Sequence, residues 1–486
     1  MSWEPARGMK APYARRTGFL LTLFTLSAAF WSAQSQPPFG PPEFYPVGLE
    51  PIDIAIGDFN GDQIPDLVTA HHRQAEIAIV PGLGDRSFGP PTFVGVGGAQ
   101  HDVTCGDLNG DQILDLALPF GGTVGRVSVL LGIGDGTFGP RTSYYVGSSP
   151  ISVEVVDLNG DQISDLVVSN FGSDNLAVLL GYGDGTFGPA SFYDCGSMPR
   201  DVAVGDLNGD RIPDLVTAAM NSDRVGVLLG AGDGTFGPLN LYVAGEQPWS
   251  VALGDFNGDE VLDIAVTNSG YPGLDFLGVL LGVGDGTFET VTFYRVGDGP
   301  HTIAIADFYS DGVLDLIVAN EYSDTVSVLL GNGNGTFGPP TNYWTGNGPS
   351  SVAVGDLDGN QIPDLALADA NEDAVAIFLG AAGGAGVDGS LQAPLFSRLS
   401  SVSPNPISGQ ATIDFDLREP TRARLRILDV NGRVVNCLLD QNCLAGGNRI
   451  VWDLSQGGAL QMPMGTYFLS LDAGGHKSVQ RITIVR

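Results

Sequence analysis

The sequence predicts an all-β protein, a seven-bladed β-propeller followed by a small β-sandwich. One nine-residue phrase, Asp-x-Asn-Gly-Asp-x-aliphatic-x-Asp with two variants, recurs seven times, and its copies begin 49, 50, 49, 49, 52 and 49 residues apart. Near-constant spacing is typical of repeat architectures. The composition of 70 glycines, 31 prolines and only 16% charged residues favours short strands and tight turns over long helices.

Each repeat contains four segments with the pattern of short strands. In the fourth repeat these segments are Asp201 to Gly205, Asp214 to Ala218, Arg224 to Leu229 and Leu239 to Val243, with the acidic phrase between the first two. A Gly-Asp-Gly-Thr-Phe turn separates the last two. Seven such units predict a propeller, and an open solenoid is the structural alternative.

The two ends of the repeat region favour a closed ring. The seventh repeat stops after residues 376 to 380, so its fourth strand is missing. The segment from Phe39 to Tyr45 matches the fourth-strand segment from Phe187 to Tyr193, yet no first three strands precede it. We therefore predict that the N-terminal segment completes the last blade.

Charge and the N-terminus restrict the location and the partners. The net charge of −33 argues against nucleic acid or anionic membranes as partners. Four basic residues up to Arg16, an apolar run from Phe19 to Trp31 and small residues after it indicate a secretory signal peptide over residues 1–35. An uncleaved membrane anchor is the alternative, although the run is shorter than the roughly 20 residues that a span needs. After cleavage we expect a monomer without a transmembrane segment.

The repeated acidic phrase predicts calcium sites. Calcium takes six to eight oxygen ligands, and the phrase offers side chains at positions 1, 3, 5 and 9 with a carbonyl at position 7, as the first part of an EF-hand loop does. Three carboxylates on one loop repel each other without a cation. The alternative is that these loops are only good turn formers. We expect about six or seven Ca²⁺ ions. The predicted ligands, with position 7 contributing its carbonyl, are Asp58, Asn60, Asp62, Ile64, Asp66, Asp107, Asn109, Asp111, Ile113, Asp115, Asp157, Asn159, Asp161, Ile163, Asp165, Asp206, Asn208, Asp210, Ile212, Asp214, Asp255, Asn257, Asp259, Val261, Asp263, Asp307, Asp311, Val313, Asp315, Asp356, Asp358, Asn360, Ile362 and Asp364.

Two copies of the phrase differ from the rest. The sixth has Tyr309 in place of the position-3 asparagine and Ser310 in place of the turn glycine, so we expect the weakest site there. The seventh exchanges residue types but keeps its ligand count. The aspartates of the Gly-Asp-Gly-Thr-Phe turns indicate tight hairpins and not a second metal series. The phenylalanines of these turns are predicted to fill the core between blades.

The opposite end of the blades carries the variable residues. Six residues before each acidic phrase, one position varies while the sequence around it repeats. We hypothesise that His101, Arg200, Trp249 and His301 form the ligand-binding surface there, because aromatic and polar groups suit small-ligand or glycan sites. The alternative is drift of unconstrained loops. The variable positions are Ile52, His101, Ile151, Arg200, Trp249, His301 and Ser350, and the loops between the second and third strands add His71, His72, Phe120, Phe171, Tyr271, Glu321 and Tyr322.

The region after the repeats has a different character. Strand patterns at 412–417, 424–429, 449–453 and 467–471 predict the small β-sandwich. We divide the chain into a signal peptide (1–35), a propeller (36–381), a Gly-Ala-rich linker (382–400) and a C-terminal domain (401–486). Cys437 and Cys443 lie close enough in sequence to bridge a hairpin in an oxidising compartment, whereas Cys105 and Cys195 are expected to be buried thiols.

Two resemblances follow from these motifs. The phrase Gly-Thr-Phe-Gly-Pro at 136–140, followed by Asp-Leu-Asn-Gly-Asp, resembles the FG-GAP or VCBS repeat of bacterial secreted proteins and integrin α-subunit propellers. Pro-Asn-Pro at 404–406, Asn-Gly-Arg at 431–433 and Gly-Thr-Tyr-Phe at 465–468 resemble the C-terminal sorting domain of the type IX secretion system, or the related FlgD-type immunoglobulin-like domain. The second resemblance implies contact with the secretion machinery and release from, or attachment to, the surface of a Gram-negative bacterium.

We expect a calcium-binding adhesion or binding module and not an enzyme. The sequence has no nucleophile elbow, no His-Glu-x-x-His helix and no Cys/His zinc cluster, and its five histidines are scattered. The expected ligand is an extracellular protein or glycan. One alternative is a glycan-binding lectin, and another is a polysaccharide lyase or hydrolase that uses the rim residues His101, Arg200 and His301.

Overall fold

The computed structural model describes residues 39–270 and 275–380 of the repeat region. Of the C-terminal region it describes residues 398–403, 407, 410–417, 421–428, 433–443, 446–453, 464–473 and 476–484. The predicted signal peptide and most of the predicted linker lie outside these residues. The chain divides into two compact units, Met1–Gly384 and Ala385–Arg486. Within the described residues, no helix is sufficiently long and apolar to span a membrane.

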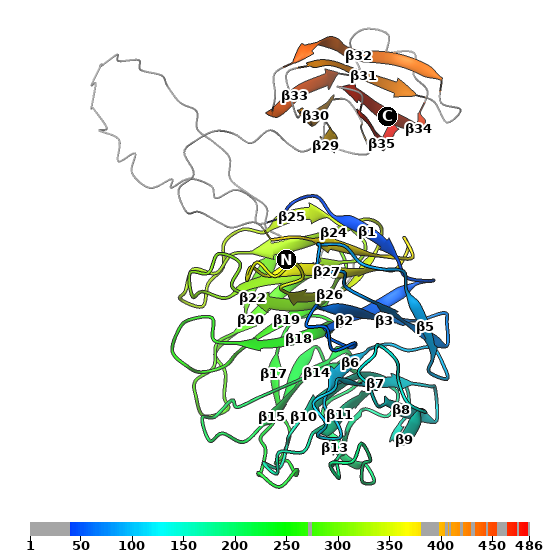
Figure 1. Ribbon diagram of the computed structural model, residues 1–486. Coiled ribbons are helices and arrows are strands. Elements are labelled where there is room, and N and C mark those ends of the chain that lie inside the picture. Colours follow the sequence, from blue (N-terminus) through cyan, green and yellow to red (C-terminus); the bar gives the residue numbers. More distant parts are fainter. Residues whose placement is uncertain are drawn as a thin grey trace, which may run out of the picture. The chain divides into compact units, whose positions relative to one another are not determined.

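The first unit consists of seven four-stranded antiparallel sheets, as predicted (Figure 1). Each sheet is one blade, and blades 1 to 6 follow the chain in order. A 3-10 turn, η1 (Met220–Ser222), follows the second strand of blade 4. The blades are β2–β5 (Pro51–Gly57, Asp66–His71, Glu76–Val80, Thr92–Gly95), β6–β9 (Thr104–Gly106, Asp115–Phe120, Gly125–Leu130, Thr142–Gly147), β10–β13 (Pro150–Val156, Asp165–Asn170, Asn175–Leu179, Ser191–Asp194), β14–β17 (Pro199–Gly205, Asp214–Ala219, Arg224–Leu228, Asn240–Val243), β18–β21 (Pro248–Gly254, Asp263–Ser269, Asp275–Leu280, Thr292–Arg295), β22–β25 (Pro300–Ala306, Asp315–Asn320, Thr325–Leu329, Thr341–Trp344) and β26–β28 with β1 (Pro349–Gly355, Asp364–Asp369, Ala374–Phe378, Glu43–Pro46).

The first strands of the blades form a closed ring. β2, β6, β10, β14, β18, β22 and β26 contact one another in this order, and β26 contacts β2 again. An open solenoid would leave its first and last repeats apart, so this alternative is wrong. The second strands are buried along nearly their whole length, because each blade packs against a neighbour on both faces.

Blade 7 is completed by the N-terminal strand, as predicted. β1 pairs antiparallel with β28, with Glu43 opposite Ile377. In Figure 1 the blue β1 lies among the yellow strands of the last blade. Phe39 forms a further bridge with Gly380, and its ring lies 5.0 Å from that of Phe308 in blade 6. The segment therefore supplies both the strand and the aromatic residue that blade 7 lacks.

Aromatic pairs repeat between the blades. In blades 4 to 6 the turn phenylalanine meets a fourth-strand tyrosine of the preceding blade edge to face, for example Tyr193 with Phe236 and Tyr242 with Phe288, both at 5.3 Å between ring centroids. Phe39 makes the equivalent contact with Tyr343 at 5.7 Å. The predicted role of these phenylalanines in the core between blades is confirmed.

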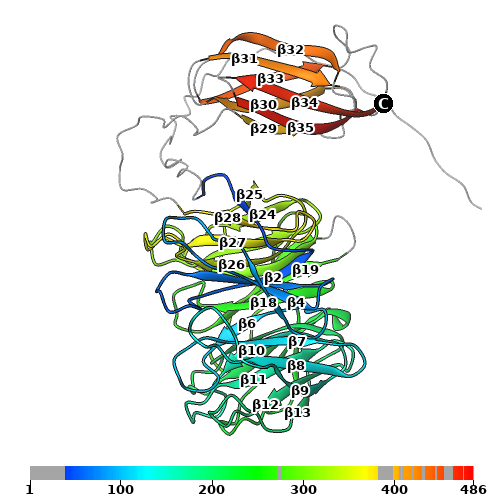
Figure 2. The same ribbon diagram turned by 45° about the vertical axis from the view of Figure 1, so that its right-hand side comes forward.

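The second unit is a β-sandwich (Figure 2), which confirms the predicted fold class. Three strands form one sheet and four form the other, and Phe415, Leu425, Trp452 and Leu469 of both sheets share one core. β29 begins at Arg398, three residues before the predicted start of this domain. The sheets are β29-β30-β33 (Arg398–Ser403, Gln410–Leu417, Gly446–Asp453) and β32-β31-β34-β35 (Val434–Cys443, Thr421–Leu428, Gly465–Ala473, His476–Ile484).

The proposed bridge between Cys437 and Cys443 is wrong. Both cysteines lie on the single strand β32, where six residues span about 20 Å. A disulfide needs Cα atoms within about 7 Å of each other. All four cysteines are free thiols; Cys195 is fully buried, as expected, whereas Cys105 is only partly buried.

Candidate functional site

The acidic loops lie at one end of the blades and share one hydrogen-bonding pattern. In blade 4, the Asp206 carboxylate accepts the backbone N–H groups of Gly209 and Asp210 on Oδ1 and that of Arg211 on Oδ2, at 2.8–3.1 Å. Asp214, which is fully buried, accepts the N–H groups of Leu207 at 2.9 Å and of Gly230 at 2.7 Å. The first aspartate therefore fixes the loop, and the last aspartate joins the loop to the backbone just after the third strand of its blade.

The donor set fits a hard divalent cation. Burial and, to a smaller extent, the charges of Asp259 and Asp255 raise the pKa of the position-9 aspartate Asp263 to about 6, although two backbone hydrogen bonds to this carboxylate act in the opposite direction. The same causes act in the other six loops. Negative charges that converge in this way disfavour ionisation, and a bound cation relieves the repulsion.

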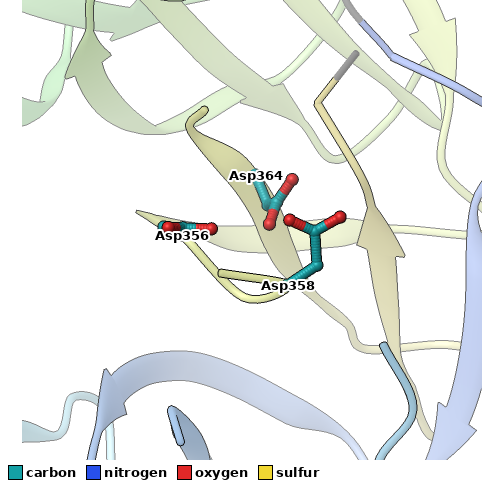
Figure 3. Close-up of side chains that lie close together, drawn as sticks. All are labelled: Asp356, Asp358 and Asp364. Atoms are coloured by element: carbon teal, nitrogen blue, oxygen red, sulfur yellow. The ribbon is translucent and has the colours of Figure 1, made fainter. Parts of the chain in front are cut away.

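The seventh loop brings three carboxylates closest together. One oxygen from each of Asp356, Asp358 and Asp364 lies within 4.8 Å of the others, and Figure 3 shows these side chains. Position 3 of this loop is aspartate, where five loops have asparagine. The loop also receives Arg86 from blade 1, whose Nε lies 3.2 Å from Asp358 Oδ2.

That ion pair was not predicted, although the sequence contains the signal for it. The turn between the third and fourth strands packs on the acidic loop of the preceding blade, where Gly136 N–H donates to the Phe59 carbonyl at 3.0 Å. Blades 2 to 6 have glycine at this turn position, whereas blade 1 has Arg86. The one arginine in the turns thus faces the one aspartate at position 3.

The sixth loop keeps its shape despite its altered sequence. Asp311 and Gly312 still donate backbone N–H groups to the Asp307 carboxylate, at 3.1 and 2.8 Å. Gly312 takes a positive φ of 81° at the position where glutamine, arginine or glutamate adopts 64–67° in the other loops, and Ser310 takes φ 52° at the usual glycine position. With Tyr309 at position 3, the amide oxygen is absent, so this loop offers one side-chain oxygen fewer.

The opposite end of the ring brings together three of the four predicted ligand residues. The guanidinium carbon of Arg200 lies 3.3 Å from the Trp249 ring centroid and 5.3 Å from that of Phe171. The His301 ring lies 4.5 Å from Trp249, and its Nε2 lies 3.9 Å from Glu321 Oε2. We call Phe171, Arg200, Trp249, His301 and Glu321 the Arg200 cluster.

Two of the predicted rim histidines, His101 and His301, are neutral at pH 7. Burial and, to a smaller extent, the positive charge of Arg200 lower the pKa of His301 to about 4. Burial, His72 and Arg200 lower the pKa of His101 to about 4 as well. His301 Nδ1 lies 2.7 Å from the Ser350 carbonyl, which only accepts hydrogen bonds. Nδ1 therefore carries the proton, and Nε2 is an acceptor that faces Glu321.

Other predicted rim residues lie elsewhere. His71 is fully buried on β3, where its ring nitrogens contact Thr69 Oγ1 and the Leu49 carbonyl, so it is a core residue and not a rim residue. Ser350 is buried as well. His101 forms a ring contact with His72 at 5.1 Å, outside the Arg200 cluster. Tyr271 lies outside the described residues.

Acidic residues directly below the rim were not predicted. The Asp201 carboxylate accepts the Ser152 hydroxyl of blade 3 at 3.0 Å and the Ser250 hydroxyl of blade 5 at 2.8 Å. Asp53 likewise joins Ser351 of blade 7 to Val103 of blade 2. These aspartates directly follow variable rim positions in the sequence. Both connect neighbouring first strands, and Asp201 joins the strand that carries Arg200 to the strand that carries Trp249.

The rim loops are fixed by a second set of contacts. Asp174, Asp223, Asp324 and Asp373 all have positive φ angles of 53–56°. Each accepts a backbone N–H from the next blade, such as Gln247 N–H on Asp223 at 3.0 Å. Because Asp373 reaches Glu50 of blade 1, these contacts also continue across the ring closure.

Comparisons with known proteins agree with this architecture. The FG-GAP-like repeat family matches residues 58–118, 157–217, 206–266 and 307–367. The secretion system C-terminal sorting domain matches residues 401–485. No curated protein matches the chain.

Several solved structures resemble the chain at low identity. A lectin from Agrocybe aegerita that recognises non-reducing terminal N-acetylglucosamine shares 21% identity, with 61% of this chain and 80% of that chain covered and a TM-score of 0.43. A catalytically inactive virginiamycin B lyase from Staphylococcus aureus shares 13% identity, with 69% and 99% covered and a TM-score of 0.45. The periplasmic gluconolactonase of Pseudomonas aeruginosa shares 17% identity, with 60% and 84% covered and a TM-score of 0.45. None of these likenesses bears on what this chain binds.

The predicted resemblances are thus confirmed by the two family matches and by the repeated four-stranded sheets. The chain is a protein of FG-GAP-like repeats that ends in a type IX secretion system C-terminal sorting domain, and it is secreted or displayed at the cell surface.

Proposed function

We propose that this protein is a calcium-stabilised binding or adhesion module whose ligand contacts the rim, at the end of the ring opposite the acidic loops. One observation carries the proposal: Arg200, Trp249 and His301 come from three blades and contact one another at the same end of the ring. Aromatic faces beside a few fixed polar groups are the usual composition of a recognition site.

The calcium part of the proposal rests on the acidic loops. Each loop would hold one ion through its side chains at positions 1, 3, 5 and 9 and its position-7 carbonyl, with one side-chain ligand fewer in the sixth loop. The bound ion would cancel the repulsion between the buried position-9 carboxylate and its neighbours. Calcium would then stabilise the scaffold beneath the rim, without touching the ligand.

The calcium proposal is tested by thermal unfolding of the mature protein with excess calcium and with chelator, together with native mass spectrometry. We expect six or seven bound ions and a large rise in Tm, because an ion that binds only the native state adds to its stability. An unchanged Tm and no bound ions would mean that the acidic loops are turns that do not bind calcium.

The binding proposal is tested on glycan and protein arrays with the wild-type protein and a double variant, Arg200→Gln with Trp249→Ala. A matched control pairs Arg295→Gln with Phe276→Ala, which removes another cation–π contact, at 5.7 Å, on the third and fourth strands of blade 5 and outside the Arg200 cluster. We expect binding to be lost only in the rim variant. Binding that survives in both variants would contradict the rim site.

The same arrays distinguish the alternatives. Selective binding of glycans would identify a lectin, and selective binding of proteins would identify an adhesin. Turnover of a polysaccharide by the wild-type protein would contradict the non-enzymatic proposal and would identify a lyase or hydrolase that acts at the rim.

A further inference from the structure

Arg200 has unused hydrogen-bonding capacity in the middle of the rim. Its Nε is fully buried and has no hydrogen-bond partner among the residues that the structure describes. No ion pair links its guanidinium to a described carboxylate, although Glu321 lies near enough to influence its pKa. A buried donor without an acceptor is costly, so this geometry suits an anionic group supplied from outside.

The surroundings fix the guanidinium and leave few alternatives for its partner. Trp249 covers it at 3.3 Å and Phe171 lies at 5.3 Å, so Arg200 is held between two aromatic rings. The Asp201 carboxylate is already occupied by Ser152, Ser250 and backbone N–H groups of Val202 and Val251. The planar fork of an arginine matches a carboxylate in two parallel hydrogen bonds.

Beside Arg200, His301 and Glu321 present two hydrogen-bond acceptors, which need donors as partners. His301 Nε2 is an acceptor, and it lies 3.9 Å from an oxygen of Glu321. Two acceptors at this distance are best satisfied by donors, and sugar hydroxyl groups are donors. The Arg200 cluster thus places an anion receptor beside a receptor for hydroxyl groups.

From this arrangement we infer that the rim ligand is an acidic saccharide, a hexuronic acid residue whose carboxylate binds Arg200 and whose hydroxyl groups bind His301 and Glu321. The inference rests on the proposed function, because it assumes that the rim is the binding surface. It adds the chemical class of the ligand. A net charge of −33 would disfavour such an anion unless a dedicated cation received it, and Arg200 is the cation in that place.

The test uses isothermal titration in calcium-containing buffer with three probes: oligogalacturonate, its fully methyl-esterified form, and succinate. We expect oligogalacturonate to bind and the other two to bind at least tenfold more weakly, because the ester lacks the charge and succinate lacks the hydroxyl groups. Arg200→Gln is expected to weaken binding tenfold to a hundredfold, roughly the loss of one charged hydrogen-bonded pair. Arg295→Gln is the matched control and should bind as the wild type does.

Three outcomes would overturn the inference. Equal binding of the acid and the ester, or full binding by Arg200→Gln with an unchanged Tm, would remove the carboxylate from the interaction. If no probe binds, the uronic acid is rejected. The rim itself is judged separately, by whether Trp249→Ala abolishes binding of whatever ligand the arrays identify. Failure of the inference and failure of the proposed function therefore give different results.

Discussion

The two ends of the propeller blades differ in how strictly they repeat. At one end, the seven acidic loops reproduce nearly the same hydrogen bonds, from Asp58 in blade 1 to Asp356 in blade 7. At the other end, the equivalent positions hold isoleucine, histidine, arginine, tryptophan and serine. The repeated end builds and fixes each blade, whereas the variable end presents different chemistry from each blade. In this protein, repetition encodes the scaffold, and departures from it mark the candidate site.

The largest expected effect comes from removing a buried aspartate of the repeated acidic loops. Asp214→Ala leaves the buried N–H groups of Leu207 and Gly230 without acceptors, so we expect a loss of about 3–5 kcal/mol in unfolding free energy. The control is Asp233→Ala, in an exposed turn, where the expected change in Tm is far smaller. Denaturant unfolding in chelator removes any contribution from calcium. Equal losses of unfolding free energy in both variants would contradict the special role of the buried aspartate.

The second prediction concerns a departure from repetition inside the ring. Glu154 lies on β10 at a position where five blades have alanine. Burial and, to a smaller extent, the charges of Asp201 and Asp53 raise its pKa to about 8. The folded state therefore binds more protons than the unfolded state between pH 4.5 and 8, so stability falls as pH rises through this interval.

Replacing this residue tests the sign of that effect. We expect Glu154→Ala to be more stable than the wild type at pH 9, by on the order of 1–3 kcal/mol, and the gain to shrink towards pH 5. Denaturant unfolding at both pH values measures it. A gain that does not depend on pH would mean that the carboxyl group is not the cause.

The third prediction concerns the titration of two histidines at the variable end. Since the pKa values of His101 and His301 are lowered to about 4, both rings should titrate near pH 4 in an NMR titration, against an ordinary value of 6.5. The unfolded chain takes up these protons first, so stability present above pH 6.5 is lost as pH falls towards 4. Arg200→Gln removes a nearby positive charge and should raise both values modestly. Titration of these histidines near pH 6.5 would contradict their burial at the rim.

The smallest expected effect concerns the ion pair between Arg86 and Asp358. A double-mutant cycle with Arg86→Gly and Asp358→Asn restores the residues of the other blades and should give a coupling energy below about 1 kcal/mol, since the arginine side chain is 64% exposed. Unfolding in chelator measures the pair alone. A coupling of several kcal/mol would make this contact a main element of ring closure.

The fold was predictable because each blade carries the complete set of sequence signals for four strands and their turns. Strand alternation, turn residues and the acidic phrase recur in the seven repeats. A strand whose pattern is weak in one repeat can therefore be assigned by comparison with the other six. The closure was predictable as well, because the segment around Phe39 copies a fourth strand. The domain start at Arg398 was harder to place, since it follows a linker without any periodic pattern.

The candidate site was predictable only as a set of positions. Variation against a constant background identified Arg200, Trp249 and His301, but it could not separate rim from core. His71 illustrates the limit: a histidine at a strand end can turn inward when Thr69 and a carbonyl group satisfy its ring nitrogens. Arg86 and Asp358 are 272 residues apart, and only the ring brings them together.

The pairing of β1 with β28 has a consequence for how the chain reaches its native state. Glu43 and Ile377 are opposite each other in the sheet, so the first strand has no partner until the last blade has been synthesised. Contacts this distant in sequence form slowly, because a long loop must close before they contribute. The ring therefore cannot close before the last blade, with β28 at Ala374–Phe378, has been synthesised. A deletion of residues 39–46 should leave an open, protease-sensitive ring.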